Sequence, residues 1–248
     1  MIRKTREKIR KFWASLALLS VEMVLITAVF VVSLLLFVFI ARNVFVVGKN
    51  EIDHKVFAFV GEALPSPKYD NFMLFITFLG RHEFLIPANL LMIAFYLFVK
   101  KHRWYSIKVP AVAITSVLLM FVLKNLFGRA RPSGEPFGPL LFEANGLSFP
   151  SGHALMSVTF YGLLIYITWH EVKNPTLKWA LIIALLLLIH LIAFSRIYLR
   201  VHYFTDVTAG RAMGFIWLVF SLKAMRRIEK FSRRNIDPVV KEVPAPQS

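Results

Sequence analysis

Several apolar stretches of this chain approach the roughly 20 residues that an α-helix needs to cross a bilayer. Backbone N–H and C=O groups find no water partners in lipid, so such a stretch folds as a helix with internal hydrogen bonds. The composition agrees, because 57% of the residues are hydrophobic and only 18% are charged. The predicted fold is all-α, an integral membrane six-helix transmembrane bundle. The six spans are predicted at residues 14–40, 83–99, 107–127, 153–169, 177–194 and 204–222.

The spans leave little chain for a separate soluble domain. We expect a basic cytoplasmic segment at 1–13, one membrane domain at 14–235 and a disordered cytoplasmic tail at 236–248. The first apolar stretch is too long for the core of a cleavable signal peptide, so we expect it to remain as the first span. The chain contains no cysteine, which excludes disulfides and thiolate metal sites.

The formal net charge of +16 is compatible with a nucleic-acid-binding protein, but its distribution favours a membrane protein. Basic residues gather at 3–11, 100–108 and 223–234, and each group adjoins an apolar span. An excess of lysine and arginine on the cytoplasmic side is usual in multi-pass proteins. We therefore expect a plasma-membrane protein with both termini in the cytoplasm and no nucleic acid partner. The sequence does not define an oligomeric state.

With the N-terminus inside, the ends of spans three and five and the starts of spans four and six face outside. Cations lie at these places against the usual charge rule. They are Lys124, Arg129, Arg131, Arg196 and Arg200. Charged residues at membrane depth are costly and usually functional. Snorkelling toward lipid headgroups is the alternative role that we retain for Arg129 and Arg200.

The segment between spans one and two predicts a short amphipathic helix lying in the membrane interface. Its apolar residues follow helical spacing, and they are Val56, Phe57, Phe59, Val60, Ala63 and Leu64. The prolines at 65 and 67 are expected to end this helix, which either anchors the chain or guides a lipid. Residues 128–149 are rich in Gly and Pro, and we expect them to form a lid or mouth on the outer surface.

The tetrapeptide Pro150-Ser151-Gly152-His153 begins span four. Serine is a favoured N-cap, and glycine lets the backbone approach a ligand closely. The exposed N–H groups and the positive end of the helix make an anion site, which His153 would face from the first turn. Taken alone, the tetrapeptide could equally be a capped helix start without function.

A histidine and an aspartate stand four residues apart at the start of span six, His202 and Asp206. On a helix this spacing places both side chains on one face. A carboxylate beside an imidazole fixes its tautomer and supports the positive charge that forms when the other nitrogen attacks. A structural pair that caps a helix is the alternative for these two residues in isolation.

Lys124, Arg131 and Arg196 would repel one another in one small volume unless an anion lay among them. Arginine donates two parallel hydrogen bonds to a phosphate, and lysine supplies a mobile point charge. Together the clusters predict phosphoryl transfer, in which His202 attacks phosphorus to form a phosphohistidine. His153 would donate a proton to the leaving oxygen and then activate water. Fixed cations replace a metal ion in this scheme, so no metal ligand and no cofactor is predicted.

In order and spacing, these residues match the signature of the type-2 phosphatidic acid phosphatase superfamily of lipid phosphatases, which this chain closely resembles. The signature reads K-x6-RP, PSGH and SR-x5-H-x3-D, and residues 124–132, 150–153 and 195–206 match every fixed position. The resemblance extends over about residues 14–222 and implies metal-independent catalysis. By this resemblance the phosphate-binding residues are Lys124, Arg131, Ser151, Gly152 and Arg196. His202 is then the nucleophile, Asp206 its support and His153 the acid.

Two positions differ from what is usual in that family. Arg200 stands where a small residue is expected, and Phe204 stands where proline is common. Both flank His202, so they could alter headgroup selectivity. His190 and Glu22 lie within predicted spans, and we expect packing or snorkelling roles for both.

The resemblance implies a membrane lipid phosphate as the substrate, hydrolysed at the outer face. Candidates are undecaprenyl diphosphate, phosphatidylglycerophosphate, phosphatidic acid and diacylglycerol pyrophosphate. A polyprenyl diphosphate is slightly favoured, because it is released outside during envelope synthesis. The alternatives are a lipid phosphotransferase that uses the same phosphohistidine, an anion or lipid transporter, and a non-catalytic scaffold. The polar clusters at span ends argue against the transporter, whose site is usually at the midplane.

Overall fold

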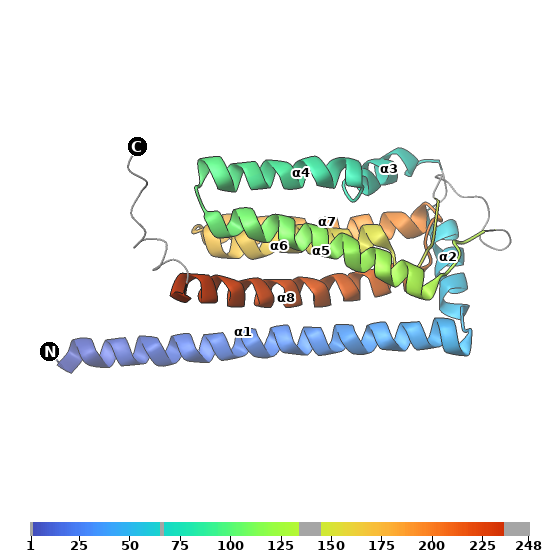
Figure 1. The fold of residues 1–248 in the computed structure, drawn as a ribbon. Coiled ribbons are helices and arrows are strands. Elements are labelled where there is room, and N and C mark those ends of the chain that lie inside the picture. The colour runs from blue at the N-terminus through green and yellow to red at the C-terminus, as the bar shows by residue number, and fades with distance from the viewer. Residues whose placement is uncertain (1, 65–66, 134–144, 236–248) are drawn as a thin grey trace.

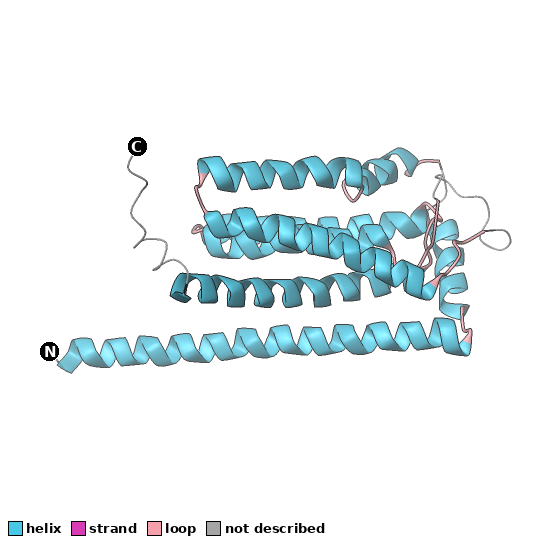
Figure 2. Cartoon of the chain, viewed as in Figure 1, coloured by secondary structure: helices cyan, strands magenta, loops and turns pink. Residues whose placement is uncertain are grey.

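The computed structural model describes residues 2–64, 67–133 and 145–235, and every regular element within these ranges is a helix. The all-α prediction is therefore confirmed, as Figure 2 shows. The predicted tail at 236–248 and much of the predicted lid, 134–144, lie outside the described residues. The helices are α1 (Ile2–Arg42), α2 (Glu51–Ala63), α3 (Asp70–Phe78), α4 (His82–Ala94), α5 (Arg103–Phe127), α6 (Gly152–Glu171), α7 (Pro175–Tyr198) and α8 (Phe204–Asn235). Short π-helical segments extend α1 (Asn43–Val47) and α4 (Phe95–Val99).

Five helical stretches of the described chain are long and apolar enough to cross a membrane. They are Met23–Val47, His82–Val99, Arg103–Phe127, Pro175–Tyr198 and Phe204–Arg234. These correspond to predicted spans one, two, three, five and six. The fourth predicted span forms a helix, α6, but α6 is not among the stretches that meet both criteria, so the six-span count stays a prediction.

The position of α6 accommodates the polar side chains along it. It packs against α5, α7 and α8 and so lies inside the bundle (Figure 1). Its buried residues include Ser157, Thr159 and Tyr161, besides aliphatic side chains. A helix that neighbouring helices cover can carry hydroxyl groups that a lipid-facing helix would have to expose to hydrocarbon. The outer helices show the opposite pattern, with Leu91 on α4 and Leu126 on α5 each 71% exposed.

Close packing between α6 and α8 depends on glycines of α8. A Cβ atom added to Gly210 would lie 2.6 Å from the Ser151 carbonyl oxygen, and one added to Gly214 would lie 2.8 Å from the Leu155 oxygen. Small residues at these positions let the two backbones approach, as is common between membrane helices. The contact brings the start of α6 directly against the first turns of α8.

The segment between the first two spans contains two helices rather than one. α2 runs across one end of the bundle and α3 follows it at the same end (Figure 1). The predicted amphipathic helix exists, but the prediction of its buried face was partly wrong. Phe59 is 69% exposed, and the buried residues of α2 are Asp53, Phe57 and Val60. The burial of a carboxylate on this helix was not predicted.

The end of the bundle that carries α2 also holds the polar clusters. The end of α5, the start of α6, the end of α7 and the start of α8 lie there, opposite the start of α1 and the end of α8 (Figure 1). Gly128 follows α5 with φ +61°, a left-handed conformation that ends the helix and turns the chain into the segment that leads to α6. The fold thus gathers residues that are far apart in sequence at one end of the molecule.

Candidate active site

All eight sequence-predicted site residues lie at this end and are connected by contacts. Lys124, Arg131, Gly152, His153 and His202 line one cavity. The Ser151 N–H donates to the Asp206 carbonyl oxygen at 3.0 Å, and the His202 N–H lies 3.3 Å from the Arg196 carbonyl oxygen. Because these bonds join α6 to α8 and α7 to the turn before α8, they fix the motifs relative to one another.

His202 and Asp206 meet, although His202 does not lie on a helix as predicted. It belongs to the turn before α8, and its Nδ1 lies 3.5 Å from Asp206 Oδ2. Ser148 Oγ lies 3.3 Å from the same Nδ1 and donates to Asp206 Oδ2. The hydroxyl therefore lies between imidazole and carboxylate and links them. His202 is 1% exposed and Asp206 0%.

The other ring nitrogen of His202 faces a cation. Arg131 Nη1 lies 3.2 Å from His202 Nε2. An arginine can only donate, so Nε2 accepts and the ring proton resides on Nδ1, toward Ser148 and Asp206. Burial lowers the pKa of His202 well below its usual value, and the neighbouring cations Arg196, Arg131 and Lys124 lower this pKa further. The ring is neutral at pH 7, with the Nε2 lone pair toward the cations.

The three predicted phosphate-binding cations contact the protein in this structure. Lys124 Nζ donates to the Leu147 carbonyl oxygen. Arg131 donates to carbonyl oxygens of residues 145, 146 and 201 at 3.0, 3.1 and 2.8 Å. Arg196, 2% exposed, donates through Nη1 to Thr77 Oγ1 at 2.5 Å. These bonds hold the cations at the cavity end and join two of them to the segment before α6.

Three buried polar atoms in this region have no hydrogen-bond partner in the described part of the chain. They are Ser151 Oγ, His153 Nε2 and Arg196 Nε. Ser151 occupies the N-cap position of α6, but its side chain makes no capping bond, contrary to its predicted capping role. The N–H groups in the first turn of α6 also have no carbonyl partner within the helix. A buried unpaired polar atom is costly, so this set is suited to an anion that accepts hydrogen bonds.

Arg129 does not snorkel toward headgroups, which corrects that interpretation. Its side chain is 10% exposed and forms ion pairs with Asp53 at 2.9 Å and Asp206 at 2.6 Å. Arg200, the other candidate for snorkelling, is half-buried with φ +59°. This left-handed conformation explains why a small residue is expected there. Phe204 is the first residue of α8, where proline is favoured.

Sequence reasoning missed Asp53, Thr77 and Ser148, which bind Arg129, Arg196 and Asp206 respectively. Ser148 lies two residues before Pro150, where the Pro150–His153 motif begins, so its proximity to the motif was a usable signal. Nothing in the sequence links Asp53 to Arg129, 76 positions later, or Thr77 to Arg196, 119 positions later. His190 is exposed on α7 and lies 2.8 Å from the Leu186 carbonyl oxygen, as expected for a residue outside the site. The side chain of Glu22 lies outside the described part.

The cavity at the site has a volume of about 1040 Å³ and extends along the bundle. Its polar end carries Lys124, Arg131, His153 and His202, and its walls come from apolar residues of α4 and α5. Those wall residues include Leu85, Ile86, Leu90, Ile93, Ile114, Val117, Leu118 and Phe121. One cavity thus joins cations and histidines to a long apolar surface. Within the described residues, no group of three or more His, Asp or Glu side chains gathers as metal ligands would.

Comparisons with known proteins agree with the signature. The family model of the PAP2 superfamily matches residues 105–230. The chain is 33% identical over 171 residues to phosphatidylglycerophosphatase B of Bacillus subtilis, which covers 68% of this chain and 81% of that protein. It is 29% identical over 150 residues to an undecaprenyl-diphosphatase of Sulfolobus acidocaldarius, covering 60% of this chain and 66% of that protein.

A solved structure shares the fold. The crystal structure of a transmembrane PAP2-type phosphatidylglycerolphosphate phosphatase from Bacillus subtilis aligns with a TM-score of 0.69 at 27% identity. The alignment covers 82% of this chain and 98% of that one. The apolar helices and these relatives together make the chain a multi-pass membrane protein. It belongs to the PAP2 superfamily, the family of membrane lipid phosphatases.

Proposed function

We propose that this protein is a metal-independent phosphatase that hydrolyses the phosphate or diphosphate headgroup of a membrane lipid through a phosphohistidine on His202. The observation that carries the proposal is the single cavity of about 1040 Å³, whose polar end holds His153, His202, Lys124 and Arg131 and whose walls are mostly apolar. A lipid phosphate has the same division, with an anionic head and a long apolar tail. The cavity therefore fits an amphiphilic substrate better than a soluble phosphate ester.

In the first step the phosphate lies among Lys124, Arg131 and Arg196. There it replaces the carbonyl acceptors of Lys124 and Arg131 and the Thr77 hydroxyl that accepts from Arg196. The first-turn N–H groups of α6 add donors to the same oxygens. The Nε2 lone pair of His202 attacks phosphorus in line, and an N–P bond forms as the bond from phosphorus to the lipid oxygen breaks. The positive charge that develops on the ring is stabilised by Asp206, directly and through Ser148.

His153 supplies and removes the proton. In protonated form it donates to the departing oxygen, which leaves as an alcohol or, from a diphosphate, as a lipid monophosphate. The neutral ring then takes a proton from water, whose oxygen attacks phosphorus while the N–P bond breaks. Inorganic phosphate is released and both histidines return to their starting state.

The relatives and the predicted topology support two candidate classes of substrate. Relatives at about 30% identity are a phosphatidylglycerophosphatase and an undecaprenyl-diphosphatase, so both a glycerolipid monophosphate and a polyprenyl diphosphate are candidates. The positive-inside pattern of the sequence supports a site at the outer face of a plasma membrane. A polyprenyl diphosphate released on that side would reach the cavity without crossing the bilayer, and for that reason we favour it.

The test is phosphate release by detergent-purified protein from a panel of lipid phosphates and diphosphates in excess chelator. The panel compares wild type with His202→Ala and with His190→Ala, a change of the same kind at an exposed residue of α7. We expect release by wild type and His190→Ala, and loss of release in His202→Ala. Equal release by all three proteins would exclude His202 as the nucleophile. Transfer of phosphate to an added lipid alcohol, without release, would identify a phosphotransferase instead.

A further inference from the structure

Arg129 lies between two buried carboxylates that come from different helices. Its Nη1 is 2.6 Å from Asp206 Oδ1 on α8, and its Nη2 is 2.9 Å from Asp53 Oδ2 on α2. The side chains of both aspartates are 0% exposed, and that of Arg129 is 10% exposed. A buried carboxylate without a partner is strongly destabilising, so one guanidinium serves both.

The remaining contacts leave Arg129 little freedom. Its Nη1 also donates to Thr205 Oγ1 at 2.8 Å, and its guanidinium carbon lies 3.8 Å from the centre of the Tyr203 ring. Thr205 and Tyr203 flank the first residue of α8, immediately after His202. The guanidinium is therefore held on one side by the chain that carries the nucleophile and on the other by α2.

Asp53 makes a second set of contacts with the same turn. Its Oδ1 accepts the Thr205 N–H at 2.9 Å, and its Oδ2 accepts the Thr205 hydroxyl at 2.8 Å. A carboxylate that binds a free N–H in the first turn of a helix acts as a cap and complements the positive end of the helix. This cap comes from a residue 152 positions earlier in the chain.

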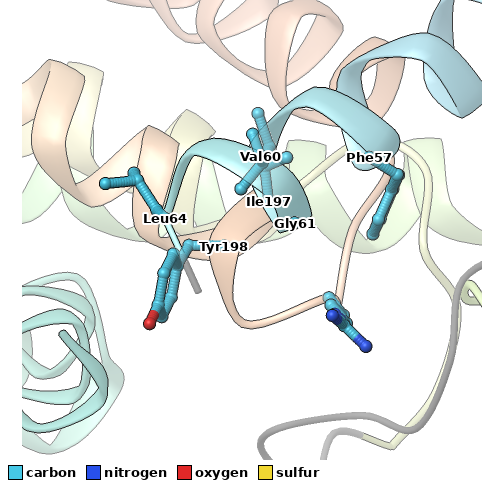
Figure 3. A pocket seen from close by; sticks show the side chains of 7 residues that line it. Phe57, Val60, Gly61, Leu64, Ile197 and Tyr198 are labelled. Atoms are coloured by element: carbon cyan, nitrogen blue, oxygen red, sulfur yellow. The ribbon is translucent and has the colours of Figure 1, made fainter. Parts of the chain in front are cut away.

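The helix that carries Asp53 is itself fixed against the bundle. Val60 of α2 and Leu64, which follows that helix, pack with Ile197 and Tyr198 at the end of α7, and Figure 3 shows these side chains and Phe57 around one hollow. The hollow left between them measures only about 20 Å³, so the surfaces fit closely. Asp53 thus projects from a helix that is docked on the last turn of α7, close to the nucleophile turn.

We propose that Arg129 and Asp53 are positioning residues for the phosphatase reaction, an inference that rests on the function proposed above. Arg129 holds the Asp206 carboxylate so that its second oxygen stays directed at Ser148 and His202 Nδ1. Asp53 holds Arg129 and the first turn of α8. Neither residue touches the cavity, and neither belongs to a fixed position of the family signature. The interfacial helix α2 then serves catalysis by orientation, beyond any anchoring role.

The experiment compares Arg129→Gln and Asp53→Asn with exposed controls of the same charge, Arg42→Gln at the end of α1 and Glu51→Gln on α2. The substrate is the lipid phosphate that wild type hydrolyses fastest, and each variant is first checked by thermal unfolding in detergent. Arg129→Lys is included because it keeps the charge but cannot bridge two carboxylates with a planar fork. The readouts are kcat, KM and the acid limb of the pH profile of kcat/KM.

A misplaced catalytic group lowers the rate of the chemical step more than substrate binding. We therefore expect kcat to fall roughly 100-fold in Arg129→Gln with KM within about twofold of wild type. Asp53→Asn should show a smaller loss in kcat of the same kind, and Arg129→Lys should recover part of the rate. The two control variants should match wild type.

The acid limb separates positioning from general loosening of the fold. The charged and titratable groups around His202 are Asp206, Arg131, Arg196, Lys124 and His153. Removing the Arg129 cation favours protonated His202 and moves the acid limb to higher pH. Removing the Asp53 anion leaves the charge of Arg129 less compensated, which disfavours protonated His202 and moves the acid limb to lower pH. Loosening of the fold alone would admit water around the His202 ring and move the acid limb to higher pH in both variants.

His202→Ala in the same series separates this inference from the proposed function. If His202→Ala abolishes activity while Arg129→Gln and Asp53→Asn behave like their controls, the positioning role is wrong and the phosphatase proposal stands. An acid limb that moves to higher pH in both variants also overturns the positioning role. So does a change in KM without a loss in kcat. If His202→Ala keeps wild-type activity, the proposed function itself fails.

Discussion

His202 stays neutral at physiological pH because its surroundings penalise a second ring proton. Burial and the cations Arg196, Arg131 and Lys124 all lower its pKa well below the usual value. A group whose pKa is lowered becomes protonated only when the pH falls through that lowered value. Titration of the His202 ring, followed by NMR of labelled histidine and assigned with His202→Gln, should show no protonation from pH 7.5 down to about 6.5. A midpoint at or above that pH would contradict the arrangement described.

His153 offers a second prediction at the scale of a single residue. As the acid for the departing oxygen, it matters most when that oxygen leaves as a poor leaving group. His153→Ala should lower kcat/KM, which reports the steps up to formation of the phosphohistidine, by about 10²–10⁴-fold for a lipid phosphate. The loss in kcat/KM should be much smaller for an aryl phosphate, whose leaving oxygen needs no proton. Equal losses for both substrates would assign His153 to binding rather than to proton transfer.

Helix α6 is placed by its contact with α8, and this contact connects packing to chemistry. The Ser151 N–H binds the Asp206 carbonyl oxygen at 3.0 Å, and Gly210 lies beside the same serine. A side chain on Gly210 would meet backbone atoms, which cannot rotate away. The glycine therefore sets the distance between the anion-binding turn of α6 and the turn that follows the nucleophile.

Gly210→Ala should lower stability by about 1–3 kcal/mol, as overpacking of a close contact does. It should also lower kcat, because the added Cβ would lie 2.6 Å from the Ser151 carbonyl oxygen. Gly162→Ala is the matched control, since its Cβ would lie 2.6 Å from the end of the flexible Leu218 side chain. Unfolding temperature and phosphate release, measured on both, should show a loss of activity in Gly210→Ala alone. Wild-type activity in Gly210→Ala would separate this packing from the site.

The elements that sequence could predict are those with a local signal. The apolar stretches predict α1, α4, α5, α7 and α8, and the motif Ser151-Gly152-His153 predicts the start of α6. Helix α3 was missed because its nine residues are too short to show a periodic pattern. The prediction of the buried face of α2 was partly wrong. An aspartate is expected to face water unless its charge is paired, and the partner of Asp53, Arg129, is known only from the structure.

The candidate site likewise contains residues that the sequence predicts and residues that only the tertiary structure reveals. Its eight motif residues were predicted to converge, since chemistry and the family signature constrain them together. Asp53 and Thr77 belong to the outer segment between the first two spans, and only the packing of α2 and α3 across the bundle end brings them to Arg129 and Arg196. Such partners are set by tertiary structure, which a single sequence does not reveal.

The cavity gives the whole molecule a testable preference for lipids. Val117 of α5 lines the apolar part of the cavity, whereas Val122 of the same helix is 63% exposed and does not line it. Val117→Trp should fill part of the space for a lipid tail and lower kcat/KM for a long-chain lipid phosphate, while Val122→Trp leaves it unchanged. Hydrolysis of a soluble aryl phosphate should be unaffected in both, because the polar end is intact.

A loss of about tenfold corresponds to 1.4 kcal/mol of transition-state stabilisation, the order expected from losing roughly two buried methylene contacts. The measurement is kcat/KM for lipid phosphates of increasing chain length in mixed micelles at fixed surface concentration. In wild type the value should rise with chain length until the tail fills the space between α4 and α5, and in Val117→Trp it should level off at a shorter chain. A parallel loss for the aryl phosphate would mean that the tryptophan disturbs the histidines, and an unchanged chain-length profile would show that the tail lies elsewhere, outside the α4–α5 cavity.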